Sequence, residues 1–403
     1  MATFLPLEII VDILYRLPVN DLLRYRCVSK QWRSLIDGPD FIKLHLNHSK
    51  QSNSNLAAVL FNKNDILRID LDSLGGAAAV KLNHPIDDGS EIFILGSCNG
   101  LVALLNFRED VVFWNPSTRK YRKLPASKDV DEPSSFYYHG FHFYGFGHDP
   151  INDDYKLVKI TQFHGELEDS FESDIAVYTT KTDSWRSSKI FLPYLIDLKT
   201  PNGVLLGNAL HWVASKQPQK SDSSESIVAF DLVTEQYIEI PKPEYWKNGY
   251  VEMFLDVLGS SLCVTCNYFM EIIVDMFWSR RVDIWVMKEY GVKGSWNKMF
   301  TVEPSEAIGI FGYLVPFAYL KSGDQVILHT NERFILYDLR RKRAKNVSIR
   351  GLPEHFGMFS CMASLVELNG GWDRKKKKQE RQKKDHDAKQ RDDFPSKGFK
   401  SVL

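Results

Sequence analysis

The sequence predicts a mostly β protein with a small α-helical N-terminal domain, in which three short helices precede a β-propeller of about six blades. Three observations support this fold class. Residues 1–36 carry apolar side chains at helical spacing, and short β-type runs bounded by turn residues follow from residue 56 onward. A strand-turn phrase then recurs roughly every 50 residues, a period typical of kelch-like propeller blades.

The bulk composition fits a globular protein. The 403 residues are 44% hydrophobic, enough to bury a sizeable core, and the net charge of zero argues against chain-wide affinity for nucleic acid or anionic membrane. Five cysteines, an odd number, favour reduced thiols over a disulfide framework. Without a long apolar run or a basic leader segment, we expect a soluble protein that stays inside the cell.

The first predicted helix has one broad apolar face. Its apolar residues span an arc of about 140° on a helical wheel: Ile9, Ile10, Ile13, Leu14 and Leu17. Val11 and Tyr15 lie on the other side, which indicates that this helix also faces another protein. Pro18 ends the helix, and Ser29 is a suitable cap for the third helix, which carries Trp32.

The order of residues in this segment resembles the F-box. The matching positions are Leu5, Pro6, Glu8, Ile13, Leu14, Leu17, Pro18, Leu22, Val28, Lys30, Trp32 and Leu35. The resemblance implies a docking module for the Skp-type adaptor of a cullin-RING ubiquitin ligase, with the cullin scaffold reached through the adaptor. The residues it assigns to adaptor binding are Leu5, Pro6, Ile9, Ile10, Ile13, Leu14, Leu17, Pro18, Leu22, Val28 and Trp32. From the pattern alone, the helices could instead only cover one end of the next domain.

Composition changes set the expected domains. We place the F-box at 1–45, a linker at 46–55, the propeller at 56–371 and a basic C-terminal tail at 372–403. Within the propeller region, the six copies of the phrase align on Ile69, Trp114, Tyr178, Phe230, Trp285 and Tyr337. A second phrase, with Gly, Asn or Ser before a short apolar strand, occurs at 96–105, 205–214, 257–266 and 320–329. Together the two phrases predict the two hairpins of one blade.

The propeller region resembles the F-box-associated domain of plant F-box proteins. The residues that carry this resemblance lie at 96–102, 113–125, 143–160, 206–213, 282–296 and 391–403. The chain is most similar to the members that act as constitutive suppressors of plant defence-gene expression. For that subfamily the implied cargo is an intracellular immune receptor of the nucleotide-binding leucine-rich-repeat type.

Catalytic and metal-binding motifs are not evident, so we expect no catalytic residues, no cofactor and no metal. The sequence contains no GxSxG and no GxxxxGK. Cys263 and Cys266 form a lone CxxC that a strand would split between its two faces, which favours buried packing over zinc or redox chemistry. Two His pairs at i, i+3 are expected to be exposed or locally bonded: His45 with His48, and His139 with His142.

Recurring tryptophans are expected in the blade cores, with sugar stacking as the alternative. They are Trp114, Trp185, Trp212, Trp285 and Trp296. Three inserts break the repeats, at 126–142, 164–174 and 216–227. Such loops either carry recognition or have no role.

The C-terminal tail holds twelve Lys and Arg against six Asp and Glu. Its run Lys375, Lys376, Lys377, Lys378 predicts a nuclear-import signal or a contact for an acidic partner, or else an idle solvated segment. We therefore expect a cytoplasmic and nuclear protein. The apolar residues that end the tail are expected to pack back on the body: Phe394, Phe399, Val402 and Leu403.

These observations together predict a non-enzymatic substrate receptor of a Skp-cullin-F-box (SCF) ubiquitin ligase. In this interpretation the F-box recruits the ligase, and the propeller binds a target protein for ubiquitination and proteasomal degradation. Tethering raises the effective concentration of the target near the ubiquitin-carrying enzyme. The alternative is a β-propeller that binds a glycan or small ligand, with the helices as a cap and no ligase role.

Overall fold

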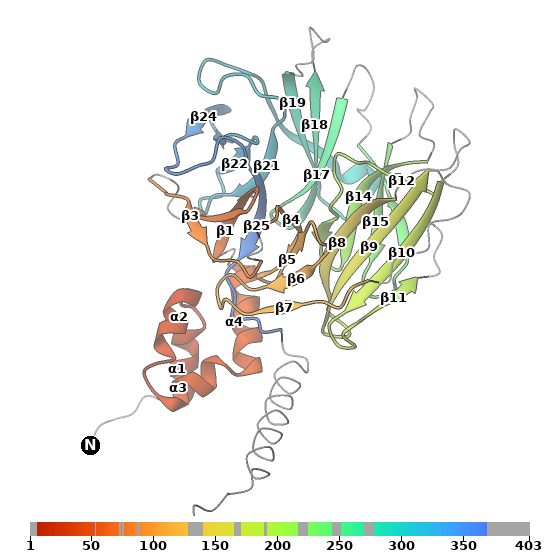
Figure 1. Ribbon diagram of the computed structural model, residues 1–403. Helices are drawn as coiled ribbons and strands as arrows, with labels where there is room; N and C mark the ends of the chain where they lie inside the picture. The colour runs from red at the N-terminus through yellow and green to blue at the C-terminus, as the bar shows by residue number, and fades with distance from the viewer. Residues whose placement is uncertain are drawn as a thin grey trace, which may run out of the picture. The chain divides into compact units, whose positions relative to one another are not determined.

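The computed structural model describes residues 6–368 with gaps at 53, 72–73, 75, 87–88, 128–139, 165–170, 189–191, 217–224, 244–250 and 270–277. The chain up to Val366 forms one compact unit, in which helices are followed by six β-sheets (Figure 1). Within the described part of the chain, every helix is too short or too polar to cross a membrane. The whole basic tail from 372 lies outside the described residues, and so do the run Lys375–Lys378 and the four terminal apolar residues.

The helical domain has four helices, one more than the sequence predicted. They are α1 (Leu7–Leu14), α2 (Val19–Tyr25), α3 (Lys30–Ile36) and α4 (Pro39–Gln51). The Ser29 side chain caps α3 as expected, since its Oγ accepts a hydrogen bond from the backbone N–H of Trp32 at 3.1 Å.

Helix α4 corrects the expectation of a linker from residue 46, because residues 46–51 form its last turns. Pro39 lies in the first turn of α4, where a backbone N–H would have no hydrogen-bond partner within the helix. Its buried residues follow at four-residue spacing, namely Phe41, His45 and Ser49. Because two of these three are polar, a search for apolar periodicity does not detect the helix.

The six sheets are the blades of a β-propeller, each with four strands except blade 4, which has five. Blade 1 consists of β25 (Gly357–Met362), β1 (Leu56–Asn62), β2 (Asp65–Asp70) and β3 (Val80–Leu82). Blade 2 consists of β4 (Ile92–Cys98), β5 (Leu101–Asn106), β6 (Val111–Trp114) and β7 (Tyr121–Lys123). Blade 3 consists of β8 (Phe141–Asp149), β9 (Asp154–His164), β10 (Phe171–Thr179) and β11 (Ser184–Ser188).

The other three blades continue in chain order. Blade 4 consists of β12 (Leu195–Ile196), β13 (Val204–Leu206), β14 (Ala209–Ser215), β15 (Glu225–Asp231) and β16 (Tyr237–Ile240). Blade 5 consists of β17 (Val251–Leu258), β18 (Ser261–Phe269), β19 (Ser279–Met287) and β20 (Trp296–Val302). Blade 6 consists of β21 (Val315–Tyr319), β22 (Gln325–His329), β23 (Phe334–Asp338) and β24 (Arg343–Val347).

The first blade is built from both ends of the propeller sequence. Strand β25 pairs antiparallel with β1, from Leu56 opposite Met362 to Phe61 opposite Gly357. The last strand in the chain therefore completes the first sheet, and this pairing closes the ring of blades without an unpaired edge on β1. The sequence phrases did not indicate this exchange, because β25 belongs to none of them.

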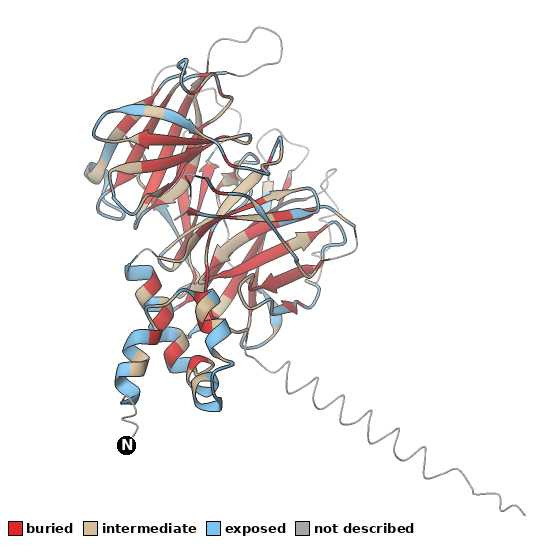
Figure 2. Cartoon of the chain, turned by 90° about the vertical axis from the view of Figure 1, so that its left-hand side faces the viewer, coloured by how far each residue is buried: buried red, intermediate tan, exposed pale blue. Residues whose placement is uncertain are grey.

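The recurring phrase marks the third strand of every blade. Its six alignment positions lie on β2, β6, β10, β15, β19 and β23 and are all buried: Ile69, Trp114, Tyr178, Phe230, Trp285 and Tyr337. Figure 2 shows buried residues along the strands of each blade. The second phrase falls on hairpins, as predicted: β4–β5, β13–β14, β17–β18 and β21–β22.

The polar turn after the third strand has a repeated hydrogen-bond pattern. In blade 4 the Asp231 carboxylate accepts the backbone N–H groups of Val233 and Thr234, at 2.8 and 2.7 Å. Asn115 in blade 2 and Asp338 in blade 6 do the same for the residues two and three positions later. Each turn then reaches a left-handed residue, at Arg119, Glu235 and Lys342. Asn and Asp favour such turns because their side chains can hydrogen-bond to nearby backbone N–H groups.

Neighbouring blades are linked by equivalent ion pairs. Arg122, on the fourth strand of blade 2, contacts the Asp183 carboxylate in the turn of blade 3 at 2.6 Å. Arg186, at the equivalent position of blade 3, contacts Glu235 in the turn of blade 4. Because the Arg122 side chain is almost fully buried, its pair with Asp183 is less screened by solvent than a surface pair.

The five tryptophans divide into two groups. Trp114, Trp212 and Trp285 are buried in the blade cores, as predicted. Trp185 and Trp296 are only half-buried, which corrects the expectation for these two. Both lie on fourth strands and donate an indole N–H to the proline carbonyl after the preceding blade, Pro125 at 2.9 Å and Pro241 at 2.6 Å. They therefore link blades and do not fill them.

The core role of Trp285 predicts a large loss of stability on truncation. Trp285→Ala should lower the free energy of unfolding by about 3 to 5 kcal/mol, because it removes a large buried aromatic side chain. Chemical denaturation measures this change. Trp278→Ala is the matched control, since Trp278 is 40% exposed and its loss should change stability little. Equal effects of the two substitutions would contradict the assignment.

Buried histidines predict a pH dependence of folding. Burial lowers the pKa of His211 and of His329 to about 4, below the ordinary value of about 6.5. Between these values the unfolded chain binds protons that the folded chain does not. The two neutral histidines therefore make their full contribution to the free energy of unfolding above about pH 6.5. As the pH falls toward 4, this free energy decreases by more than about 1 kcal/mol for each histidine.

Denaturation curves of His329→Gln measured from pH 7 to pH 4.5 test this expectation. The variant should show a smaller loss of stability on acidification than the wild type. His355→Gln is the control, because the His355 side chain is 68% exposed. If the free energy of unfolding of His329→Gln falls with pH as steeply as that of the wild type, His329 does not titrate as inferred.

Candidate functional site

The helical domain has a small core of its own. Leu14, Val19, Leu22, Ile36 and Phe41 are buried together, and Ile10, Val11, Tyr15, Leu17, Trp32 and Leu35 pack against them. Ala363 and Leu365, from the segment that follows β25, belong to the same cluster. The four helices thus do not bury their apolar surface alone, as expected for so small a unit.

One buried polar group fixes α4 in this core. His45 is 1% exposed, and its Nε2 lies 3.0 Å from the Leu17 carbonyl oxygen. Burial lowers the pKa of His45, although the bond to Leu17 partly opposes this shift. A neutral imidazole can donate a hydrogen bond to the carbonyl. This bond therefore holds α4 against the connection between α1 and α2 without burying a charge.

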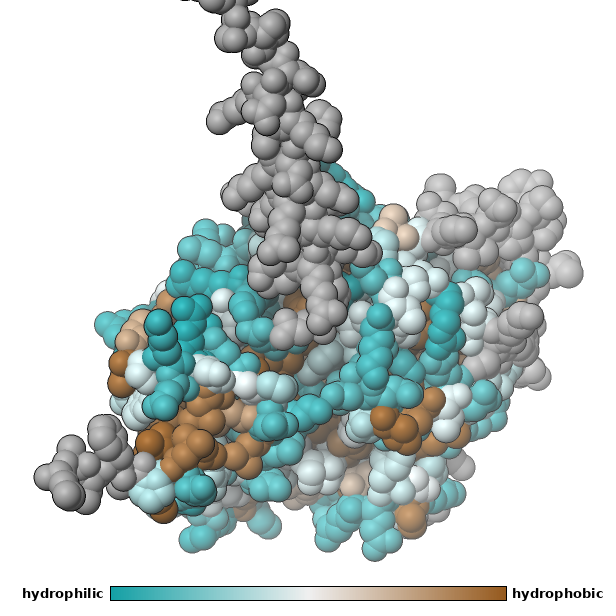
Figure 3. Space-filling view, turned by 90° about the horizontal axis from the view of Figure 1, so that it is seen from below, coloured by the Kyte–Doolittle hydropathy of each residue, from teal (hydrophilic) through white to brown (hydrophobic). Residues whose placement is uncertain are grey.

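An exposed apolar surface remains on the outside of the helices. We call it the helix patch and define it by Leu7, Ile9, Ile13 and Val28, which are 59%, 46%, 50% and 61% exposed. Figure 3, viewed from the helix side, shows hydrophobic residues gathered near the N-terminus. Several large exposed apolar side chains in one small domain are typical of a protein interaction site. Helices that served only as a cap would not require them.

The predicted adaptor-binding residues fall into three groups. Pro6, Ile9, Ile13, Pro18 and Val28 are exposed, and Ile10, Leu17 and Trp32 are half-buried. Leu14 and Leu22 are buried, and their packing holds the helices together. Leu5 lies outside the described residues.

The two sides of α1 are also assigned differently from the expectation. Val11 and Tyr15, expected to face another protein, pack against the helical core, whereas Ile9 and Ile13 are exposed. The wheel correctly predicted an amphipathic helix. It could not show which part of the broad apolar arc the other helices cover.

A short strap ties the helices to the propeller. Residues 363–366 leave β25, and the Asn115 amide donates to the carbonyls of Ser364 and Val366 at 3.2 and 2.8 Å. Gly100 has a φ of +81°, and a Cβ at this position would overlap the Ser364 side chain and the Met362 carbonyl. The Gly of the second phrase is therefore required here by close approach of the strap.

Two faces of the propeller can be distinguished by topology. Because α4 leads into β1, second strands run away from the helices, and the turns before second strands and after third strands lie on the helix side. The ion pair of Lys43 in α4 with Asp153, in the turn between β8 and β9, agrees with this assignment at 2.7 Å. All other connections lie on the opposite side, which we call the far face (Figure 1).

The far face carries the inserts and several exposed apolar residues. The strand ends that flank the three inserts all lie there, although 128–139, 165–170 and 217–224 are outside the described residues. Phe93 and Phe107 lie there in edge-to-face contact, with ring centroids 5.4 Å apart, and remain 39% and 66% exposed. Trp278 and Ile310 are further exposed residues on far-face connections.

The candidate metal ligands do not come together. Cys263 and Cys266 are buried in two different clusters, on opposite faces of β18 as predicted. His45 is bonded to a backbone carbonyl, and His142 lies 3.1 Å from Thr161 Oγ1, while His139 is outside the described residues. Across the described ranges, no group of three or more His, Cys, Asp or Glu side chains is arranged to hold a metal ion.

Comparison with known families matches these two parts of the structure. Residues 4–44 match the F-box domain, and residues 60–357 match the F-box associated beta propeller domain. The chain therefore belongs to the F-box proteins that carry an F-box-associated β-propeller.

Curated plant proteins are similar over most of the chain. The F-box protein CPR1 of Arabidopsis thaliana is 36% identical over all of both chains. An F-box/kelch-repeat protein of the same plant is 27% identical over 84% of this chain and 89% of the relative. Among solved structures, the tricorn protease aligns with 75% of this chain and 31% of its own at 10% identity and a TM-score of 0.36, too weak to argue from.

The division of α1 into buried and exposed residues predicts opposite outcomes for neighbouring substitutions. Leu14→Ala should destabilise the protein by about 2 to 5 kcal/mol, because Leu14 is 2% exposed in the helical core. Ile13→Ala should change stability by less than about 0.5 kcal/mol, since Ile13 is half exposed. Thermal and chemical denaturation of both variants measure the difference. If Ile13→Ala loses more stability than Leu14→Ala, the buried and exposed sides of α1 are assigned the wrong way round.

Proposed function

We propose that this protein is a substrate receptor of an SCF-type ubiquitin ligase. The helix patch binds a Skp-type adaptor, and through it the cullin scaffold. The propeller binds a target protein and presents it for ubiquitination and proteasomal degradation. The protein itself supplies proximity and no catalytic group, as F-box proteins generally do.

The observation that carries this proposal is the helix patch. It belongs to a domain that matches the F-box, and its four large apolar side chains stay exposed although the same helices bury a core on their other side. Burying the patch under a partner would remove apolar surface from water and stabilise a complex.

The far face is the proposed site for the target protein. Long inserts on a rigid scaffold commonly carry recognition, and exposed aromatic residues such as Phe93 and Phe107 are typical of contact surfaces. It also lies opposite the helices, so that a target bound there does not compete with the adaptor.

We propose an immune receptor of the nucleotide-binding leucine-rich-repeat type as the cargo. This proposal is supported by the similarity of the whole chain to the defence-suppressor subfamily, and it makes the protein a regulator of plant defence.

Adaptor capture tests the ligase function. The double variant Ile9→Asp with Ile13→Asp should lose capture of a purified Skp-type adaptor by at least about tenfold, because two carboxylates would have to lose water in an apolar interface. Phe93→Asp with Phe107→Asp is the matched control, with the same change at exposed apolar residues of the far face. This control should bind the adaptor normally.

The same two variants separate the two surfaces in cells. Affinity capture under proteasome inhibition should show that the far-face variant keeps the adaptor and loses the target protein, while the helix-patch variant keeps the target and loses the adaptor. If the helix-patch variant captures the adaptor as the wild type does, the ligase role fails, and the alternative of a glycan- or ligand-binding propeller with a helical cap gains support.

We further propose that the protein is both cytoplasmic and nuclear, with the basic run Lys375–Lys378 as the import signal. The sequence of this run supports the proposal. Deletion of the four lysines should shift a fluorescent fusion toward the cytoplasm, measured by imaging, without changing the melting temperature. An unchanged nuclear fraction would mean that the run has no address function.

A further inference from the structure

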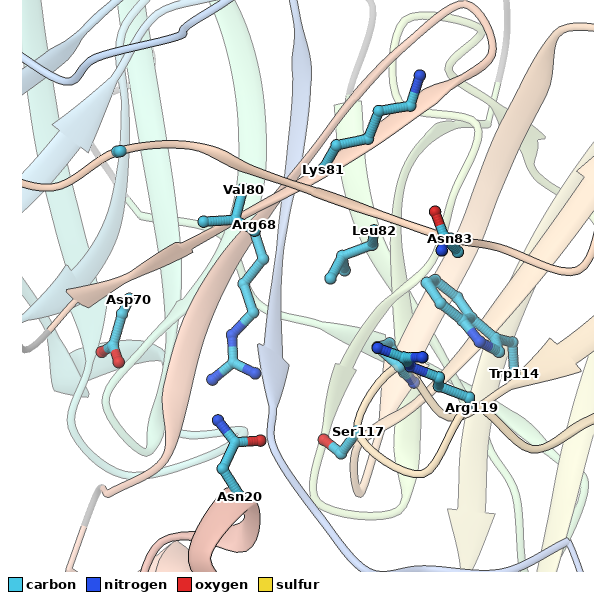
Figure 4. Close-up of a pocket in the computed structure, with 12 residues that line it drawn as sticks. Asn20, Arg68, Asp70, Val80, Lys81, Leu82, Asn83, Trp114, Ser117 and Arg119 are labelled. Atoms are coloured by element: carbon cyan, nitrogen blue, oxygen red, sulfur yellow. The ribbon is translucent and has the colours of Figure 1, made fainter.

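A cavity lies between the helices and the helix-side ends of blades 1 and 2, away from both the helix patch and the far face. Its volume is about 400 Å³. Asn20 of α2 forms one wall, Arg68 of β2 and Lys81 of β3 come from blade 1, and Ser117 and Arg119 come from the turn after β6 (Figure 4). Residues far apart in the sequence thus contribute polar groups to one space.

The charge of this cavity is positive. Arg68, Lys81 and Arg119 line it, whereas the only lining carboxylate among the described residues is Asp70. Lys81 pairs with Asp65 at 2.6 Å. Neither Arg68 nor Arg119 forms an ion pair within the described part of the chain, in contrast to Arg122 and Arg186 of the neighbouring strands. In Figure 4 the Arg68 guanidinium extends toward the carboxamide of Asn20.

We propose that this cavity binds a small phosphorylated organic ligand. The phosphate group lies between Arg68 and Arg119, where planar guanidinium groups can each donate two parallel hydrogen bonds to phosphate oxygens. The Asn20 amide and the Ser117 hydroxyl supply further donors. The volume falls within the range of small-molecule sites and exceeds the need of a phosphate ion alone, and Val80 and Leu82 in the lining leave an apolar region for the organic part.

Such a ligand would connect the two domains. Asn20 belongs to the helical domain, whereas the two arginines belong to blades 1 and 2, so the bound phosphate would cross-link them by hydrogen bonds. Because the ligand binds the folded arrangement and not the unfolded chain, it should also raise the melting temperature. This inference does not depend on the ligase function, and adaptor capture by the same variants reports on that function separately.

The test is calorimetric titration of the full chain with inorganic phosphate, pyrophosphate and glucose 6-phosphate at constant ionic strength, together with melting curves. We expect glucose 6-phosphate to bind more tightly than inorganic phosphate and to raise the melting temperature. Arg68→Gln and Arg119→Gln should each weaken binding about tenfold, since each removes a charge-assisted contact. Asn20→Asp should weaken it as well, because it adds a negative charge to the cavity wall.

Arg343→Gln is the matched control, an exposed arginine on β24 outside the cavity, and it should bind like the wild type. Melting curves without any probe show whether each variant is folded. No binding above that of sodium chloride at equal ionic strength, or equal binding by Arg68→Gln, Arg119→Gln and Arg343→Gln, overturns the proposal. Equal affinity for inorganic phosphate and glucose 6-phosphate overturns its organic part.

Discussion

The pairing of β25 with β1 is the interaction on which the rest of this structure depends. It joins the last described strand of the propeller to the first, so that β1 has a partner on both sides and blade 1 has four strands. The chain then continues directly into the strap, where Ala363 and Leu365 complete the core of the helical domain. One continuous segment of backbone therefore both closes the ring and attaches the helices. A substitution that disrupts the β25 pairing would also displace the strap from the helical core.

Repeated local chemistry holds the blades in a constant relation. In blades 2, 4 and 6 an Asn or Asp after the third strand satisfies backbone N–H groups of its own turn. In blades 3 and 4 the same turn presents an acidic residue to the arginine of the preceding blade. Trp185 and Trp296 add hydrogen bonds between fourth strands and the connection that follows the preceding blade. These contacts use equivalent positions of successive repeats and link blades 2, 3, 4 and 5 to one another.

Rigidity matters because the proposed role separates two binding surfaces. The helix patch and the far face lie at opposite ends of the strands, and the strap and the Lys43–Asp153 ion pair oppose rotation of one against the other. A receptor that works by proximity gains from such a fixed spacing, since flexible tethering lowers the effective concentration of the target at the reacting centre. The basic cavity lies where the two domains meet. A ligand bound there would therefore also fix the position of the helical domain against the propeller.

The sequence alone determined the fold class and the six-fold repeat, because periodicity and turn chemistry are local properties that six copies reinforce. The F-box was indicated by the resemblance of residues 5–35 to that family. Ile69, Trp114 and their equivalents could be aligned as repeats for this reason, while the structure showed that they are buried on third strands. Only the tertiary structure showed that α4 exists, that β25 completes blade 1, and that Leu14 is buried while Ile13 is exposed. It also showed that Arg68 and Arg119 share one cavity. Each of these depends on contacts between residues far apart in the chain, and no local pattern records which part of an apolar face, or which arginine, a distant segment will cover.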